Sequence, residues 1–267
     1  MLDNLKSKYI LKEILEKIKN KRKLNIIKYN KIIKAKLNIN KEDFEIYITL
    51  KEFNNKYKTN IEDIDIREIN LSRINIENEG LKDLAKIKFK ELNKLDLSNN
   101  KISDISVLEK VNFKELKELY LSRNKISDIS ILEKVNFKEL NKLNLSWNKI
   151  SDISILEKAN FKELKELNLS WNKISDINIL EKVNFKELNK LNLSNNKISD
   201  INILEKVNFK ELKGLNLSSN DISDISILEK VNFKELNKLY LSDNKINKQE
   251  YSSLIKNLKS KINKVFI

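Results

Sequence analysis

A phenylalanine recurs every 24 residues along most of this chain. The positions are Phe89, Phe113, Phe137, Phe161, Phe185, Phe209 and Phe233. Around them the frame L-x-x-L-x-L-x-x-N-x-I-x-x-I repeats almost unchanged, as it does from Leu92 to Ile105. A unit this short cannot bury its apolar face alone, so its copies have to stack and share one continuous core. The period therefore predicts a solenoid.

Each unit is expected to contribute one short strand. In the first complete unit, Leu95 and Leu97 alternate with polar residues, which points the leucines inward and the polar side chains outward. One such strand per unit, stacked in parallel, would form a sheet along the inner curve of the solenoid. The units thus predict an α/β fold with its sheet on one side.

The outer arc of each unit is expected to be a short helix. Ser106 and Glu109 have the spacing of a capping box, S-x-x-E, and the later units repeat it with Ser or Asn as the cap. After the cap, Val107, Leu108 and Val111 are expected to face the core. An aspartate before each helix, such as Asp104, is expected to form a neutral surface ladder with nearby lysines.

An asparagine stands where each unit turns out of its strand. A buried amide there can satisfy N–H and C=O groups of neighbouring coils. We therefore predict a structural asparagine ladder, formed by Asn100, Asn124, Asn148, Asn172, Asn196, Asn220 and Asn244.

The repeated frame resembles the leucine-rich-repeat family, and the K-I-S-D-I segment is similar to internalin-type and phosphatase-regulator-type repeats. The resemblance implies a curved solenoid with a parallel sheet on the concave face and short helices on the convex face. We assign residues 59–267 to it, closed by a helix and a strand near residues 247–267. Nine strands are expected, and the first could begin in the register of Ile61 or that of Ile66.

Residues 1–58 lack the period and have helical apolar spacing. One interpretation is a helical cap that covers the first repeat. The run from Glu13 to Leu37 also resembles an F-box, a helical module that docks an adaptor subunit of ubiquitin ligases. That resemblance implies a second possible function, in which residues 5–37 bind a ligase adaptor and the solenoid selects a substrate.

The net charge of +14 lies at the two ends of the chain. Residues 1–60 hold 16 basic and 7 acidic side chains, residues 245–267 hold six and one, and the part between them holds 31 of each sign. A solenoid that binds nucleic acid would be expected to carry a basic stripe along its repeats. The basic ends leave tethering to nucleic acid or an anionic membrane as a third possibility.

The composition argues against an enzyme. The chain has no histidine and no cysteine, so the commonest general base and the thiolate nucleophile are missing, and its two glycines cannot form a phosphate loop. We predict no catalytic residue, no cofactor, no metal site and no small-molecule substrate. With no leader and no apolar run long enough to span a membrane, we expect a monomer in the cytoplasm or the nucleus.

Two columns of residues vary while the frame stays fixed. One lies between the last two leucines of each unit, and the other comes just before the ladder asparagine. By alternation, both are expected on the inner face. They bring exposed Trp, Tyr and Arg together, as protein-binding hot spots do, so we predict that a partner protein binds there. The candidate residues are Tyr120, Arg123, Asn144, Trp147, Asn168 and Trp171.

Overall fold

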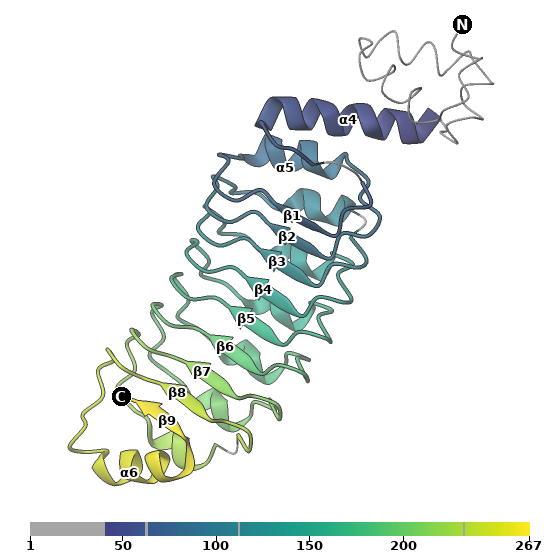
Figure 1. The fold of residues 1–267 in the computed structure, drawn as a ribbon. Helices are drawn as coiled ribbons and strands as arrows, with labels where there is room; N and C mark the ends of the chain where they lie inside the picture. Colours follow the sequence, from purple (N-terminus) through teal and green to yellow (C-terminus); the bar gives the residue numbers. More distant parts are fainter. Residues whose placement is uncertain (1–40, 62–63, 112, 232) are drawn as a thin grey trace, which may run out of the picture. The chain divides into compact units, whose positions relative to one another are not determined.

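The structure is a computed structural model that describes residues 41–61, 64–111, 113–231 and 233–267. Among them the chain forms two compact units. One contains the helix α4, Lys41–Tyr57, and the other contains the whole sheet (Figure 1). The F-box-like segment, residues 5–37, lies outside the described residues. The boundary expected between residues 58 and 59 stays a prediction.

The segment after helix α4 is bonded back to its last turn. The Thr59 N–H donates to the Asn54 carbonyl at 3.0 Å, one of the carbonyls that the end of a helix leaves without an intrahelical partner. Asn54 Oδ1 accepts hydrogen bonds from the Ile61 N–H at 3.0 Å and from the Thr59 hydroxyl at 2.6 Å, and its Nδ2 donates to the Ile61 carbonyl at 2.8 Å. Leu50 and Phe53 on this helix are both buried.

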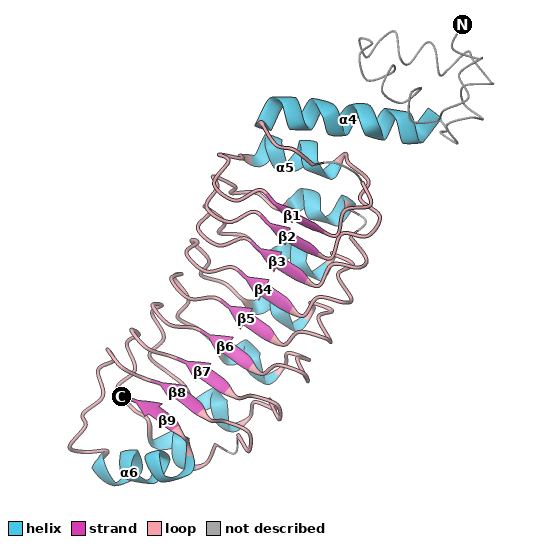
Figure 2. Ribbon diagram, in the orientation of Figure 1, coloured by secondary structure: helices cyan, strands magenta, loops and turns pink. Residues whose placement is uncertain are grey.

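Nine short strands form one parallel sheet in simple sequence order (Figure 2). They are β1 (Glu68–Asn70), β2 (Lys94–Asp96), β3 (Glu118–Tyr120), β4 (Lys142–Asn144), β5 (Glu166–Asn168), β6 (Lys190–Asn192), β7 (Gly214–Asn216), β8 (Lys238–Tyr240) and β9 (Lys264–Phe266). Ile69 pairs with Leu95, which settles the entry register in favour of the frame that begins at Ile66. The predicted solenoid with nine strands is confirmed.

The core is a set of straight apolar columns. The middle residue of each strand from β1 to β8, and the leucine two positions later, are at most 3% exposed. Behind them lies the phenylalanine column, in which Phe137, Phe161 and Phe185 are each 1% exposed. Every coil thus buries the same side chains against its two neighbours, as the period required.

The length of a coil decides which helix it carries. The two coils in which middle strand residues are 26 positions apart hold α-helices, α5 (Asn78–Ala85) and α6 (Ser252–Lys261). The 24-residue coils hold tighter 3₁₀ helices. These are η2 (Ser106–Lys110), η3 (Ser130–Glu133), η4 (Ser154–Glu157), η5 (Asn178–Glu181), η6 (Asn202–Glu205) and η7 (Ser226–Glu229).

The 3₁₀ geometry of η2 aligns three buried residues. With three residues per turn, Ile105, Leu108 and Val111 fall on one line and are buried. Val107 lies to the side of that line and is half-buried. The equivalent Ile131, Ile203 and Ile227 are at most 9% exposed, so the position expected to face the core is covered less completely at Val107 than in those coils.

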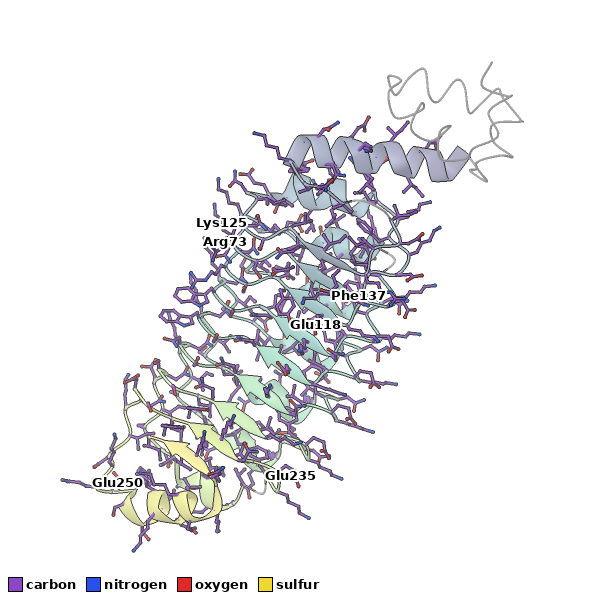
Figure 3. The ribbon with its side chains drawn as sticks, in the orientation of Figure 1. Arg73, Glu118, Lys125, Phe137, Glu235 and Glu250 are labelled. Carbon is purple, nitrogen blue, oxygen red and sulfur yellow. The ribbon has the colours of Figure 1, made fainter. Side chains whose placement is uncertain are left out.

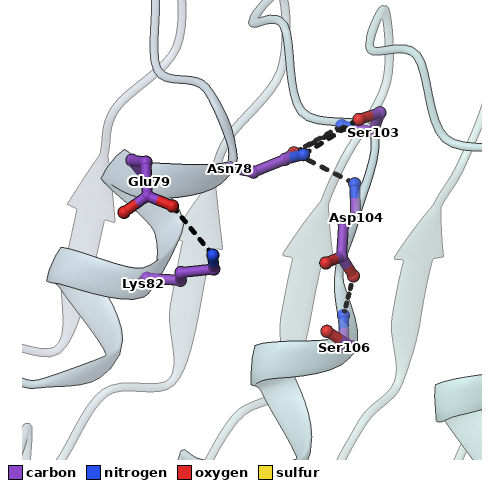
Figure 4. Close-up of polar contacts among 6 residues, drawn as sticks. All are labelled: Asn78, Glu79, Lys82, Ser103, Asp104 and Ser106. Carbon is purple, nitrogen blue, oxygen red and sulfur yellow. Dashed lines mark hydrogen bonds and ion pairs between the residues drawn. The ribbon is translucent and has the colours of Figure 1, made fainter.

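The predicted capping box is wrong, because the aspartate, and not the serine, accepts the backbone hydrogen bond at the start of the helix. The cap position of η2 is Ile105, with no side-chain cap bond, whereas Asp104 Oδ1 accepts the Ser106 N–H at 2.8 Å (Figure 4). The same bond from residue i+2 forms in every later 3₁₀ coil. That backbone bond is the main cause of the lowered pKa of Asp104. The aspartates are therefore turn formers rather than a charge ladder.

The asparagine column forms the predicted hydrogen-bond pattern between coils. Asn148 Nδ2 donates to the Leu121 carbonyl of the preceding coil and to the Leu145 carbonyl of its own coil, both at 3.0 Å. Its Oδ1 accepts the Ile126 N–H of the preceding coil at 3.0 Å. The other six asparagines make equivalent bonds to the same backbone positions.

We expect Asn148→Ala to lower the free energy of unfolding by about 1–3 kcal/mol, because the Ile126 N–H loses its acceptor. The Leu121 and Leu145 carbonyls each lose one of two amide donors and keep the other, from Asn124 and Asn172. Urea denaturation followed by circular dichroism measures the change. Asn160→Ala, an exposed asparagine on the outer arc, is the control and should stay within about 0.5 kcal/mol of the parent. Equal stability of the two variants would refute the structural role of the ladder.

Candidate partner-binding surface

The open face of the sheet carries the first and last residue of every strand, because the middle residue points into the core. The first residues form a column of alternating charge from Glu68 to Lys190. Lys94 lies 3.6 Å from Glu68 and 3.8 Å from Glu118, and Lys142 lies 3.3 Å from Glu118. Lys190 forms an ion pair with Glu166 at 2.8 Å. Over β1–β6 this column is therefore close to neutral.

The alternation breaks at β7, where Gly214 occupies the place of the next carboxylate. The strands on either side contribute Lys190 and Lys238, and Lys213 precedes the glycine in the chain. Among the residues that the structure describes, Lys213 and Lys238 form no ion pair. The open face is therefore positively charged over β6–β8.

A groove of about 520 Å³ follows this face from Tyr120 on β3 to Tyr240 on β8. Its charged lining residues are Lys142, Glu166, Lys190, Lys213 and Lys238. The single carboxylate among them, on Glu166, is already paired with Lys190. The groove therefore has a surplus of positive charge.

The last strand residues line the floor of the groove with hydrogen-bond donors. Asn144 Oδ1 accepts the Ser146 N–H at 3.0 Å, and Asn168, Asn192 and Asn216 make the same bond to the serine two residues later. An amide whose oxygen is held in this way directs its NH₂ group elsewhere. Within the described part of the chain, none of these four Nδ2 atoms has a hydrogen-bond acceptor.

Tyr120 is fixed at its end of the groove. Its hydroxyl donates a hydrogen bond to Glu118 Oε2 at 2.8 Å. Burial and this bond raise the pKa of Tyr120 well above its ordinary value, so the hydroxyl stays protonated. Burial opposes ionisation of Glu118, but the bonds from Tyr120 and Lys142 and the nearby lysine charges outweigh it and lower the pKa of that carboxyl.

Arg123, Trp147 and Trp171 form a second feature, which we call the indole stack. The two indole rings are stacked with centroids 3.9 Å apart and planes at 11°, and Arg123 Cζ lies 4.4 Å from the centre of the Trp147 ring. The two tryptophans remain 39% and 44% exposed. Three consecutive coils thus present one exposed aromatic and cationic ridge.

The indole stack lies beyond the strands, which corrects the expectation drawn from alternation. Trp147 follows the end of β4 by three residues and has φ 56°, and every residue of this column has a similar positive φ. Its N–H donates to the Ser170 carbonyl of the next coil at 2.9 Å. Arg73, at the equivalent position of the first coil, lies at the edge where the chain leaves the strands (Figure 3).

The predicted site residues therefore fall into two neighbouring sets. Tyr120, Asn144 and Asn168 line the groove, whereas Arg123 and the two tryptophans form the stack beside the strand ends. Sequence reasoning missed Gly214 and the lysines around it. The signal was present, since glycine interrupts the Lys/Glu alternation with its period of 48 residues.

Gly214→Ala should raise the free energy of unfolding by about 0.5–1 kcal/mol, because glycine in a strand loses more conformational freedom on folding than alanine. Its φ is not positive, and an added Cβ would meet its nearest neighbour, Lys190 Cγ, at 4.0 Å. Thermal and urea unfolding of the variant give the value. A less stable variant would mean that the backbone here requires glycine.

Comparison with known proteins agrees with this geometry. Residues 90–134 and 114–158 match a family model described as leucine-rich repeats in two copies, and residues 163–177 match a second leucine-rich-repeat model. No curated protein sequence matches the chain. The fold, the ladder and these matches are those of a leucine-rich-repeat solenoid.

Its repeats are similar to those of internalins. The structure of internalin inlF from Listeria monocytogenes is 28% identical, with a TM-score of 0.62 over 80% of this chain. The chain spans 56% of the length of that internalin. Internalin C2 of the same organism is 27% identical, with a TM-score of 0.59, over 76% of this chain and 80% of its own. A leucine-rich-repeat protein of Leptospira interrogans, 21% identical with a TM-score of 0.51 over 75% of this chain and 60% of its own, shares the fold.

The fold is thus typical of protein–protein interaction modules. In the described ranges no helix has the length and hydrophobicity to cross a membrane.

Proposed function

We propose that the chain binds a partner protein through the indole stack and the adjoining end of the groove, including Tyr120, Asn144 and Asn168. The observation that carries the proposal is the pair of exposed, stacked tryptophans. Large apolar side chains that remain about two-fifths exposed in a cluster are typical of interaction sites.

The left-handed turn that Trp147 and Trp171 occupy does not require tryptophan. A left-handed conformation costs a non-glycine residue about 1–2 kcal/mol, and asparagine tolerates it best. Asn99 and Asn195 make the same turn with φ 57° and 55°. Coils with asparagine and coils with tryptophan therefore form the same structure, so the indoles contribute something other than the turn.

The composition of the surface also supports a protein partner. Trp, Tyr and Arg are the residues most enriched among interface hot spots. Rings held by stacking have lost part of their rotamer freedom before binding, which lowers the entropic cost of association. Arg123 adds a cation over the face of the Trp147 ring.

Affinity capture with three full-length baits tests the proposal. The baits are the parent chain, the double variant Trp147→Asn with Trp171→Asn, and Lys158→Ala on the outer arc. Asparagine is the matched replacement because this column already contains it. A partner should be recovered by the parent and by Lys158→Ala but not by the double variant. Recovery of the same proteins by all three baits would count against the stack as the binding site.

A further inference from the structure

From the groove we infer that the partner presents an extended acidic segment, which lies across β4–β8 with its carboxylates over Gly214. The inference rests on the proposed function in one respect, since it takes the open face as the docking face. It adds the chemistry of the partner and a second contact area, which the indole stack does not form.

The column of alternating charge lacks a carboxylate at β7. Where the alternating column predicts a carboxylate, the chain has Gly214, and the flanking lysines at 190 and 238 are left without it. Lys190 shows the consequence, because its side chain is 64% exposed, compared with 38% for Lys142 and 40% for Lys94. An acidic side chain of a partner can take the vacant position and pair with both lysines.

The groove also has room for a partner at Gly214. Nothing at Gly214 requires glycine, since its φ is not positive and an added Cβ would find its nearest neighbour 4.0 Å away. Glycine inside a strand often marks close approach by a ligand or another backbone. The missing side chain also leaves room in the floor of the groove, which runs past Gly214.

The floor is complementary to an extended chain. The free NH₂ groups of Asn144, Asn168, Asn192 and Asn216 repeat once per strand, about 4.8 Å apart, and can donate to carbonyl or carboxylate oxygens. The groove spans β3–β8, which is five inter-strand steps or about 24 Å. This length accommodates about seven residues of extended peptide.

A protein segment fits this floor better than nucleic acid does. Nonspecific binding of single strands relies on aromatic side chains on which successive bases stack. The groove has aromatic side chains only on its first and last strands, Tyr120 and Tyr240. Tyr240 is already stacked on Phe266, with centroids 4.8 Å apart and planes at 1°.

Fluorescence anisotropy on the full-length chain tests the inference. The probe is a labelled oligoglutamate of about eight residues, with oligoglutamine and oligothymidylate of similar length as comparisons. We expect oligoglutamate to bind the parent and, somewhat less tightly, Gly214→Ala, whose methyl group takes up part of the room in the floor of the groove. Gly214→Glu, which restores the missing carboxylate, should weaken binding about tenfold or more, and Lys238→Gln should weaken it in the same direction.

Two controls separate the groove from general attraction to a basic protein. Asn208→Glu adds the same charge at an exposed position on the outer arc and should change affinity less than twofold. Unfolding curves show whether each variant is folded. The inference is wrong if Asn208→Glu weakens binding as much as Gly214→Glu, or if oligoglutamine binds as tightly as oligoglutamate. It is also wrong if oligothymidylate binds more tightly than oligoglutamate and responds to Gly214→Glu.

The double tryptophan variant distinguishes this inference from the proposed function. Its affinity for oligoglutamate should equal that of the parent, because the indole stack does not line the groove. If oligoglutamate fails to bind while a captured partner still depends on the tryptophans, the inference fails and the proposed function stands. The reverse pattern would refute the indole stack and retain the groove.

Discussion

Leu169→Ala should lower the free energy of unfolding by about 2–5 kcal/mol, as truncation of a fully buried leucine does. Leu169 is 0% exposed and follows β5, the middle strand of the sheet, which has four strands on each side. A coil contacts only its neighbours, so the cavity cannot be filled by rearrangement elsewhere. The loss should therefore fall near the upper half of that range.

Urea denaturation followed by circular dichroism measures this loss. Lys158→Ala, in the preceding coil, is the matched control, because its side chain is 69% exposed and lies on the outer arc with a 3.8 Å ion pair to Glu133. An exposed pair of this kind contributes about 0–1 kcal/mol. If the two variants unfold at the same urea concentration, the continuous leucine core is not what stabilises the solenoid.

The sequence predicted the strands and their register because one residue type repeats at one position. Leu95 and its equivalents have to face inward in every coil, so their alternation and the 24-residue period leave a single way to stack them. The end of the stack could be predicted for the same reason, since Val265 on β9 continues the column. The predicted ladder amides occupy the turns where polar backbone has to be satisfied.

The outer arc was predicted less well than the strands, because the same short motif there is compatible with more than one hydrogen-bond pattern and helix type. The letters S-x-x-E fit a capping box. In the structure, however, the Ser106 N–H donates its hydrogen bond to the side chain of the preceding Asp104. A 24-residue coil is also too short for an α-helix of the length found in the 26-residue coils. The choice between the two helices depends on coil length, and the S-x-x-E letters from which the helix was predicted do not encode it.

The indole stack was predicted in composition but not in position, and its role in binding stays a proposal. Alternation holds only inside a strand, and Trp147 lies three residues beyond one, in a left-handed turn. Its proximity to Arg123 and Trp171 follows from the period, since equivalent residues of adjacent coils are neighbours. The role of Gly214 depends on the ion pairs around it, which only the structure shows.

The largest effect on binding is expected from Trp147→Asn combined with Trp171→Asn. Each indole should contribute about 2 kcal/mol or more to association, which is about thirtyfold in affinity. Folding stability should change by no more than about 1 kcal/mol, because relief of the left-handed strain offsets the lost ring contact of about 0.5–1.5 kcal/mol. Unfolding curves of the double variant check the second expectation.

Titration calorimetry against the captured partner measures whether the indole stack is where that partner binds. The parent and Lys158→Ala should bind with the same affinity, and the double tryptophan variant, still folded, should bind several hundredfold more weakly if the two contributions are roughly additive. Normal binding by the folded double variant, together with weakened binding by Lys158→Ala, would place the partner on the outer arc and not on the indole stack.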